Sequence, residues 1–100
     1  LVRERPIPAL ALTMLLQAVA EHCGRRLLRM KGLVSIAEMP GQPAVIHGVR
    51  HVVSAPEFLP RWPSADERTR IVLITSGVPR HFVARLLDAI EEEVREALSA

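Results

Sequence analysis

Residues 27–49 read LLRMKGLVSIAEMPGQPAVIHGV and hold two apolar runs around a segment rich in turn-forming residues. Between Leu27 and Ala37, apolar side chains alternate with more polar ones, a period typical of a strand whose two faces differ. Residues 38–42, EMPGQ, supply the proline and glycine of a reversal. Residues 44–53 alternate again and are rich in β-branched side chains. The stretch therefore predicts a β-hairpin.

The register of this hairpin decides which side chains reach the core, because a shift by one residue turns every side chain to the other face. We prefer pairs whose numbers sum to an even value near 80 or 82. An odd sum would bury both histidines and place Arg50 beside the other cations, and a one-residue bulge would spoil either assignment. In the even register the residues that face the helices are Leu28, Met30, Val34, Ile36, Ile46 and Val52, with only Arg50 out of place. The opposite face then carries Arg29, Lys31, Leu33, Ser35, Val45, His47, Val49 and His51.

This second face is half apolar and half basic. A solvated monomer does not need Leu33, Val45 and Val49 there, so the pattern indicates a docking surface for another domain. Trp62 has two interpretations, as a plug at the rim of the core or as an anchor for a partner. The candidate contact residues are Arg29, Lys31, His47, His51 and Trp62.

The chain before the hairpin predicts a strand and a helix. A short strand at Leu1–Arg5 ends at Pro6-Ile7-Pro8, because proline removes a ladder donor. Ala9–Cys23 has a helical period, and Gly24 is a candidate for the left-handed residue that closes the helix. The apolar face of this helix consists of Leu12, Leu15, Leu16 and Val19.

The chain after the hairpin predicts a loop, a strand and a second helix. Residues 54–67 hold three of the eight prolines and show no clear period, which indicates a loop. Ile71–Ile74 is apolar on both faces, as in a covered strand. Pro79 would take the first position of the last helix, and Glu91–Glu93 its solvated face, with Arg95 spaced for an ion pair with Glu91. The buried stripe of this helix would be Phe82, Val83, Leu86, Leu87, Ile90, Val94 and Leu98.

The predicted order is therefore strand, helix, three strands, helix. Each amphipathic helix has one apolar face to bury, and the simplest solution packs both on one side of an antiparallel sheet. One hundred residues suffice for one such core. We expect a single α+β domain over residues 1–100, with a four-stranded antiparallel sheet and two helices packed on one face.

Composition excludes several classes of protein. The two phenylalanines, single tryptophan and absent tyrosine leave little surface on which bases could stack, so we expect no nucleic-acid partner. No apolar run approaches the ~20 residues that span a membrane, so we expect no membrane contact. A single cysteine excludes an internal disulfide and fits a reducing, cytoplasmic setting.

No catalytic motif is present in the chain. It lacks the phosphate-binding loop G-x-x-x-x-G-K-[ST], the dinucleotide fingerprint G-x-G-x-x-G and the nucleophile elbow G-x-S-x-G. Cys23 has no His or Lys fixed beside it by spacing, which favours a buried small hydrophobe over a nucleophile. We therefore expect no enzymatic activity and no catalytic or cofactor-binding residue in this chain.

A metal site also finds little support. Neighbouring His22 and Cys23 point in different directions on a helix. His47 and His51 would share a strand face but stand about 13 Å apart, too far to share one ion. We therefore expect surface or hydrogen-bonded histidines, and no metal ligands, at the candidate positions His22, Cys23, His47, His51 and His81.

Several segments together resemble a known domain. They are R-E-R-P-I at 3–7, L-L-R-M-K-G-L-V at 27–34, A-V-I-H-G-V at 44–49, L-P-R-W-P at 59–63 and R-T-R-I-V-L-I at 68–74. Their order and spacing are similar to those of the CobW C-terminal domain over nearly the whole chain. The combination of R-x-K-G, H-G-V, a Trp-Pro loop and T-R-I-V carries the resemblance, since no single motif is diagnostic.

The resemblance implies an accessory domain, with a four-stranded antiparallel sheet, in a family of P-loop GTPases that handle cobalt or zinc. In full-length members a separate N-terminal domain carries the Walker motifs and a Cys-x-Cys-Cys metal motif, and this sequence has neither. Because the chain opens on Leu1 instead of Met, we expect a fragment of a longer GTPase whose nucleotide-binding domain is absent. That parent would use GTP, Mg and a transferred metal such as Zn or Co.

Two functions remain open from the sequence. The first is a non-catalytic regulatory or client-recognition domain, with its own N-terminal GTPase domain and a metal-receiving client as partners, in cobalamin biosynthesis or zinc homeostasis. The second is a free-standing ligand- or metal-sensing α/β module, which the histidines and the compact layout would support.

Overall fold

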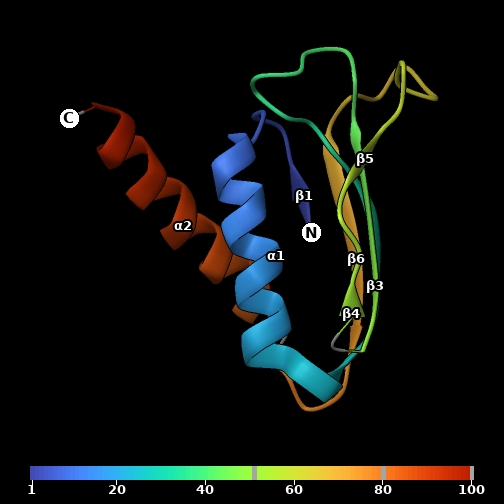
Figure 1. The fold of residues 1–100 in the computed structure, drawn as a ribbon, viewed down its shortest axis with the longest axis vertical. Coiled ribbons are helices and arrows are strands. Elements are labelled where there is room, and N and C mark those ends of the chain that lie inside the picture. Colours follow the sequence, from blue (N-terminus) through green and yellow to red (C-terminus); the bar gives the residue numbers. More distant parts are fainter. Residues whose placement is uncertain (51, 80, 100) are drawn as a thin grey trace.

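Strands and helices alternate unevenly along the part of the chain that the structure describes, residues 1–50, 52–79 and 81–99 of a computed structural model (Figure 1). In chain order the elements are β1 (Val2–Arg3), α1 (Ala9–Cys23), the 3₁₀ turn η1 (Gly24–Arg26), β2 (Leu27–Val34), β3 (Ala44–Val49), β4 (Val52–Val53), β5 (Glu57–Phe58), β6 (Thr69–Thr75) and α2 (Phe82–Ser99).

The sheet is antiparallel and runs in the order β1-β6-β2-β3-β4, with β5 paired to β3. Both helices lie on one side of it, with α1 along the strands and α2 packed on α1 (Figure 1). The predicted α+β class, with two helices and an antiparallel sheet, is confirmed. The predicted number of four strands is wrong, because the described residues form six.

Two short strands account for the difference. At Arg50 the backbone has a φ of 56°, and the chain turns back so that β4 pairs with β3 through Val49 and Val52. The single strand predicted over residues 44–53 therefore ends at Val49, and Arg50 lies in the turn, not in the sheet. Further along, Phe58 of β5 pairs with Ala44, inside the segment predicted as a loop.

The predicted parity of the hairpin is confirmed. Strands β2 and β3 pair from Met30 with Gly48 to Val34 with Ala44, so the paired numbers sum to 78, slightly below the predicted values. Even residues of both paired segments are buried toward the helices, apart from half-buried Gly32, while the odd residues lie on the opposite, open face of the sheet. Those odd residues are exposed at Arg29, Lys31, His47 and Val49 and half-buried at Leu33 and Val45.

An irregularity at the start of β2 makes the burial of Leu27 and Leu28 differ from the prediction. The pairing of β2 with β6 shifts between Leu27 and Arg29. As a result Leu27 is fully buried, whereas Leu28, predicted to face the helices, is 40% exposed. Val52, predicted on the same inner face, is 61% exposed because it follows the reversal into β4.

Gly32 allows β6 to come close to β2. A Cβ at this position would collide with the carbonyl oxygen of Arg70 and lie 2.9 Å from the Cα of Ile71. Side chains do not tolerate backbone atoms at such distances, so the position requires glycine.

Helix α1 matches its predicted bounds, and Gly24 closes it with a φ of 50°. The helix begins after Pro8, whose side chain offers no cap. Instead the backbone N–H of Ala9 donates to Oε1 of Glu38 at 3.0 Å. Because Glu38 lies between β2 and β3, this contact joins the start of the helix to the turn of the hairpin. The predicted apolar face is buried at Leu12, Leu15, Leu16 and Val19.

Helix α2 differs from its prediction at both ends. It begins at Phe82 and not at Pro79, whose carbonyl accepts the N–H of Phe82 at 3.0 Å in the preceding turn. Its predicted stripe is buried as far as Val94, with Phe82 and Leu86 only partly covered, but Leu98 is 71% exposed where the helix extends away from α1 (Figure 1). No helix of the described residues is both long enough and apolar enough to cross a membrane.

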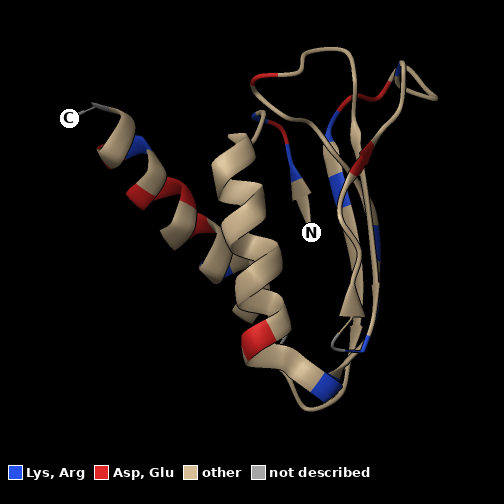
Figure 2. Cartoon of the chain, in the orientation of Figure 1, with Lys and Arg blue, Asp and Glu red and all other residues tan. Residues whose placement is uncertain are grey.

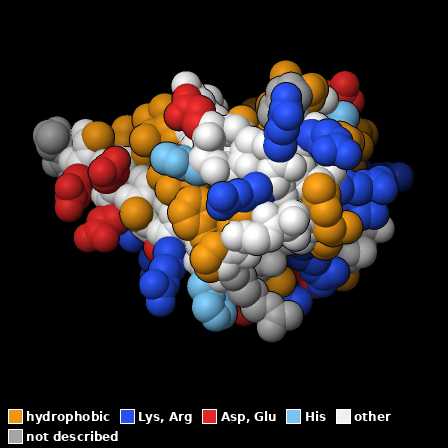
Figure 3. All heavy atoms as spheres, turned by 90° about the horizontal axis from the view of Figure 1, so that it is seen from below, with side chains coloured by type: hydrophobic (Ala, Val, Ile, Leu, Met, Phe, Trp, Pro, Cys, Tyr) orange, Lys and Arg blue, Asp and Glu red, His pale blue; other side chains and the backbone are white. Residues whose placement is uncertain are grey.

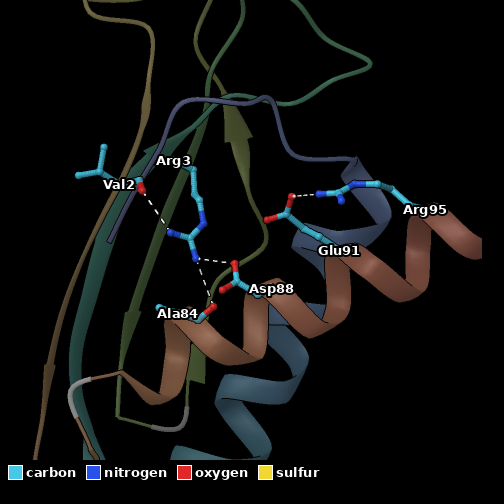
Figure 4. A network of polar contacts seen from close by, with 6 residues as sticks. All are labelled: Val2, Arg3, Ala84, Asp88, Glu91 and Arg95. Carbon is cyan, nitrogen blue, oxygen red and sulfur yellow. Dashed lines mark hydrogen bonds and ion pairs between the residues drawn. The ribbon is translucent and has the colours of Figure 1, made fainter.

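Arg3 ties β1 to α2. Its guanidinium donates to Oδ1 of Asp88 at 2.8 Å and to the carbonyl of Ala84 at 3.2 Å (Figure 4). On the same helix, Arg95 donates to Glu91 at 3.4 Å, which confirms the predicted pair. Glu91 itself, predicted on the solvated face, is only 7% exposed, and its side chain points toward the N-terminal segment that carries Arg3 (Figure 4).

Candidate interaction site on the open sheet face

The sheet face opposite the helices carries a groove of about 540 Å³, which we call the sheet groove. Strands β2, β3 and β6 form its floor, and the loop between β5 and β6 forms its wall. Clefts of this size commonly hold ligands or parts of a partner protein. Its charged and aromatic lining residues are Arg29, Lys31, His47, Trp62, Asp66, Arg68 and Arg70.

Strand pairing arranges side chains in rows across the floor of the groove. Lys31 lies in the central strand, and its neighbours across the sheet come from β3 on one side and β6 on the other. Leu33 takes the same central place in the next row. The two rows are His47–Lys31–Val72 and Val45–Leu33–Arg70.

The carboxylate of Asp66 is already engaged by two arginines. It accepts hydrogen bonds from Nε and Nη2 of Arg68, both at 3.0 Å, and it forms an ion pair with Arg70. In contrast, no ion pair or hydrogen bond within the described ranges involves the side chain of Arg29 or Lys31. The groove therefore keeps positive charge that could attract an anionic group.

Trp62 lies against this groove and not in the core. Its side chain is half-buried, and it lines the same space as Arg29, Lys31 and His47. It is absent from the cluster of core residues, so the interpretation as a plug at the core rim is wrong. The structure thus brings four of the five predicted contact residues together, and their role in contacting a partner stays a prediction. His51 falls outside the described residues.

Charge is unevenly distributed over the molecule. Most residues coloured as acidic along the helices lie on α2, whereas basic residues lie on the central strands (Figure 2). Seen from the lower end, acidic side chains collect at the α2 side and basic ones toward the sheet (Figure 3). Because α2 lies on the helix side of the sheet, its carboxylates are not placed to neutralise the groove on the open face.

The other candidate side chains lie apart from the groove. Cys23 is buried, as predicted, and this burial raises the pKa of its thiol, while the charge of Arg26 lowers it by less. His22 packs edge to face on Phe82, with ring centroids 6.3 Å apart, and His81 is exposed. Among the residues that the structure describes, no three His, Cys, Asp or Glu side chains are grouped so that they could hold a metal ion.

Sequence reasoning missed the contribution of β6 and the loop before it. In β6, Thr69 and Ile71 are buried whereas Arg70 and Val72 are exposed. The sequence does not show this alternation, because Ile71–Ile74 is apolar throughout. Extending the parity argument from β2 to this third strand would have placed Arg70 and Val72 on the open face. Asp66 and Arg68 lie in an aperiodic loop, where the sequence holds no comparable pattern.

Comparison with known proteins identifies a family that the sequence matches and solved structures that share the fold. The family model described as the cobalamin synthesis protein cobW C-terminal domain matches residues 1–91. No curated protein matches the chain.

Among solved structures, the chain is similar to the Zn(II)-bound YjiA GTPase from E. coli, with a TM-score of 0.78 and 16% identity over 90% of this chain. A Zn(II)-bound triple mutant of YjiA gives a TM-score of 0.79 and 15% identity over 91% of this chain. At these identities the likeness concerns the fold alone. The chain spans 28% of the length of each of those proteins.

Proposed function

The chain belongs to the CobW C-terminal domain family, and we propose that it is a non-catalytic domain that docks through its open sheet face and so regulates a CobW-type GTP-binding protein. The sheet groove carries this proposal. It combines apolar side chains with two cations that have no ion-pair partner in the described part of the chain, on the sheet face that the helices leave uncovered. Exposed apolar side chains next to unpaired charges are typical of surfaces that contact another domain.

The first partner is the GTPase domain of the same protein. The chain matches only 28% of the YjiA GTPase, so that protein has further chain against which a domain of this fold can pack. The open face also exposes more apolar surface than a solvated sheet needs, since Val49 is 58%, Val72 56% and Ile74 52% exposed. A metal-receiving client is the second partner of this proposal, which the domain would help to recognise.

The parent protein would use GTP with Mg²⁺ and deliver Zn²⁺ or Co²⁺, in zinc homeostasis or cobalamin biosynthesis. The cobalamin synthesis family of the chain supports a link to cobalamin, and the Zn(II) bound to the YjiA GTPase supports zinc. The metal would be cargo of the parent, held outside this chain. Cys23, a free and buried thiol, fits a reducing compartment such as the cytoplasm.

Adding this chain to the separately expressed GTPase domain of its parent tests the proposal. We expect the rate of GTP hydrolysis, or the rate at which bound Zn²⁺ passes to a chromogenic chelator, to change in a saturable manner. The variant Arg29→Glu/Lys31→Glu should lose this effect. The control Arg25→Glu changes an exposed arginine outside the groove and should keep it. No kinetic effect at a large excess of the chain would contradict the proposal.

The alternative of a free-standing metal sensor rests on His47, which is exposed in the groove. Its direct cross-strand neighbour is Lys31, and a cation beside a histidine disfavours binding of a divalent ion. Calorimetric titration with zinc and cobalt separates the two functions. Tight one-to-one binding that His47→Ala abolishes would favour the sensor over the docking domain.

A further inference from the structure

We infer that the sheet groove recognises an extended acidic segment of the type acid-x-acid-x-apolar, in which the acids are Asp or Glu. The inference rests on the proposed function and deepens it, because it specifies the chemistry of the surface that docks on the open face. The spacing of side chains along β2, the state of charge of the groove and its apolar end support it.

Side-chain spacing along β2 sets the pattern of the segment. Arg29, Lys31 and Leu33 follow one another at alternate positions and all line the groove. Alternate residues of any extended chain are about 6.6 Å apart and point to the same side. An extended segment that runs along β2 in the same direction therefore places carboxylates opposite Arg29 and Lys31 if its acids are two positions apart, and its next alternate residue lies opposite Leu33. Adjacent acids would point to opposite sides, and only one could reach the groove.

The charge of the groove favours carboxylates at these two points. Arg70 and Arg68 are occupied by Asp66, whereas Arg29 and Lys31 have no carboxylate partner in the described part of the chain. The groove thus already contains one arrangement of a carboxylate between basic side chains. A second and third carboxylate from outside would complete the same pattern along β2.

The third position of the segment meets an apolar environment. Leu33 and Val45 are half-buried neighbours in one row, whose third residue, Arg70, is already paired with Asp66, and half-buried Trp62 lines the same groove. An aliphatic side chain placed two residues after the second acid would cover this end. Such a contact removes apolar area from water, while the charged pairs fix the register of the segment.

Other occupants of the groove fit less well. A second copy of the chain would offer the acidic residues of α2, but these lie on a helix, where neighbouring side chains do not alternate by two. A single-stranded nucleic acid needs several aromatic platforms, and Trp62 is the only Phe, Tyr or Trp among the described residues that line the groove. An extended acidic segment of a protein agrees with both the charge and the spacing.

The fluorescence of Trp62 gives a direct measurement, because it is the only tryptophan of the chain. The probe is the synthetic peptide Gly-Glu-Ser-Glu-Ser-Leu-Gly with blocked ends, titrated into the full chain at low salt. Three control ligands are the glutamine analogue Gly-Gln-Ser-Gln-Ser-Leu-Gly, the isomer Gly-Glu-Glu-Ser-Ser-Leu-Gly of equal charge, and an oligothymidine. We expect saturable binding of the probe, about tenfold weaker binding of the isomer and no binding of the glutamine analogue.

Variants of the chain complete the test. Arg29→Gln/Lys31→Gln should weaken binding of the probe by about tenfold or more, whereas Arg25→Gln should leave it unchanged. Circular dichroism and the thermal midpoint confirm that each variant folds. Sedimentation at the concentrations used reports self-association, and dimers that the double variant dissolves would make a second copy the occupant and overturn the inference.

Three further results would also overturn it: equal binding of the probe and its isomer, unchanged binding by the double variant, or tighter binding of oligothymidine at the groove. Peptide binding without any effect on the GTPase domain would reject that domain as the partner while keeping the acidic segment. A kinetic effect on the GTPase domain without peptide binding would reject the acidic segment and keep the proposed function.

Discussion

Gly32 shows how one missing side chain sets the spacing of the sheet. It lies in the central strand, between Ile46 on β3 and Ile71 on β6, and the backbone of β6 occupies the space that a Cβ would need. The same strand presents Arg29 and Lys31 to the groove, so the distance between β2 and β6 also determines where these cations lie relative to Arg70. A change at Gly32 therefore affects both stability and the open face.

We predict that Gly32→Ala lowers the free energy of unfolding by about 1–3 kcal/mol, because the new methyl group pushes β6 away from β2. Urea denaturation followed by circular dichroism measures this loss. The neighbouring exposed side chain provides the control, since Lys31→Ala should change stability by less than about 0.5 kcal/mol. Equal effects of the two substitutions would show that β2 and β6 are less close than described.

Cys23 makes stability depend on pH in the alkaline range. Its pKa is raised in the folded chain by burial, so the native state keeps the thiol proton where the unfolded chain loses it. The contribution of the buried Cys23 thiol to the free energy of unfolding is therefore complete below the ordinary thiol pKa of about 8.5, and it falls as the pH rises through the pKa of the folded chain.

We predict that the free energy of unfolding decreases as the pH rises above the ordinary thiol pKa of about 8.5 and that Cys23→Ala removes part of this slope. The native thiol should also react with a disulfide reagent more slowly than the thiol in urea. A native reaction rate equal to that of the unfolded chain would contradict the burial of Cys23.

At the scale of elements, helix α1 depends on a residue that is distant in the sequence. Glu38 accepts a hydrogen bond from the N–H of Ala9, at the positive end of the helix dipole, where the local sequence offers no capping side chain. The turn of the hairpin thereby stabilises the start of the helix. Such a cap cannot be found by local pattern, because the partners are far apart along the chain.

We predict that Glu38→Ala lowers stability by about 1 kcal/mol and that Glu38→Gln, which keeps an acceptor oxygen, costs less. Chemical denaturation measures both variants. Glu57→Ala is a matched control on another exposed glutamate, which has no such contact in the described residues, and it should have little effect. A loss at Glu57 as large as that at Glu38 would contradict the capping role.

The elements that the sequence predicts well are those with a long, uninterrupted period. Helix α1 has such a period between Pro8 and Gly24, and its predicted bounds are correct. Strands β4 and β5 contain only two residues each, too few to show an alternation. They are defined by their pairing with β3, so a sequence pattern cannot predict them. The start of α2 was misplaced because proline suits the preceding turn as well as a first helical position.

For the same reason, the sequence predicted the part of the candidate site on β2 and β3 but not the part on β6. Parity fixes the open face of β2 and β3, since their polar and apolar residues differ clearly. Strand β6 has apolar residues on both faces, so its share of the groove depends on the pairing with β2. The bulge near Leu28 is a local departure from regular pairing, and no sequence pattern predicts it.

At the scale of the whole molecule, a run of acidic residues lies on α2, on the helix side, and basic residues lie on the central strands of the sheet, beside the few acidic residues of β5 and of the loop before β6 (Figure 2). In the proposed docking, this asymmetry would orient the partner before contact, because complementary charge steers association and is screened by salt. A domain of this kind would approach the acidic surface of its partner with the open sheet face first. Its docking should therefore weaken as ionic strength increases.

Docking of the open sheet face is tested by the affinity of the chain for the separately expressed GTPase domain of its parent, measured by calorimetry at low and high salt. We expect binding that weakens with salt, that Arg29→Glu/Lys31→Glu reduces by about tenfold or more, and that Arg25→Glu leaves intact. Binding that the double variant does not weaken would place the contact elsewhere on the chain and contradict docking through this face.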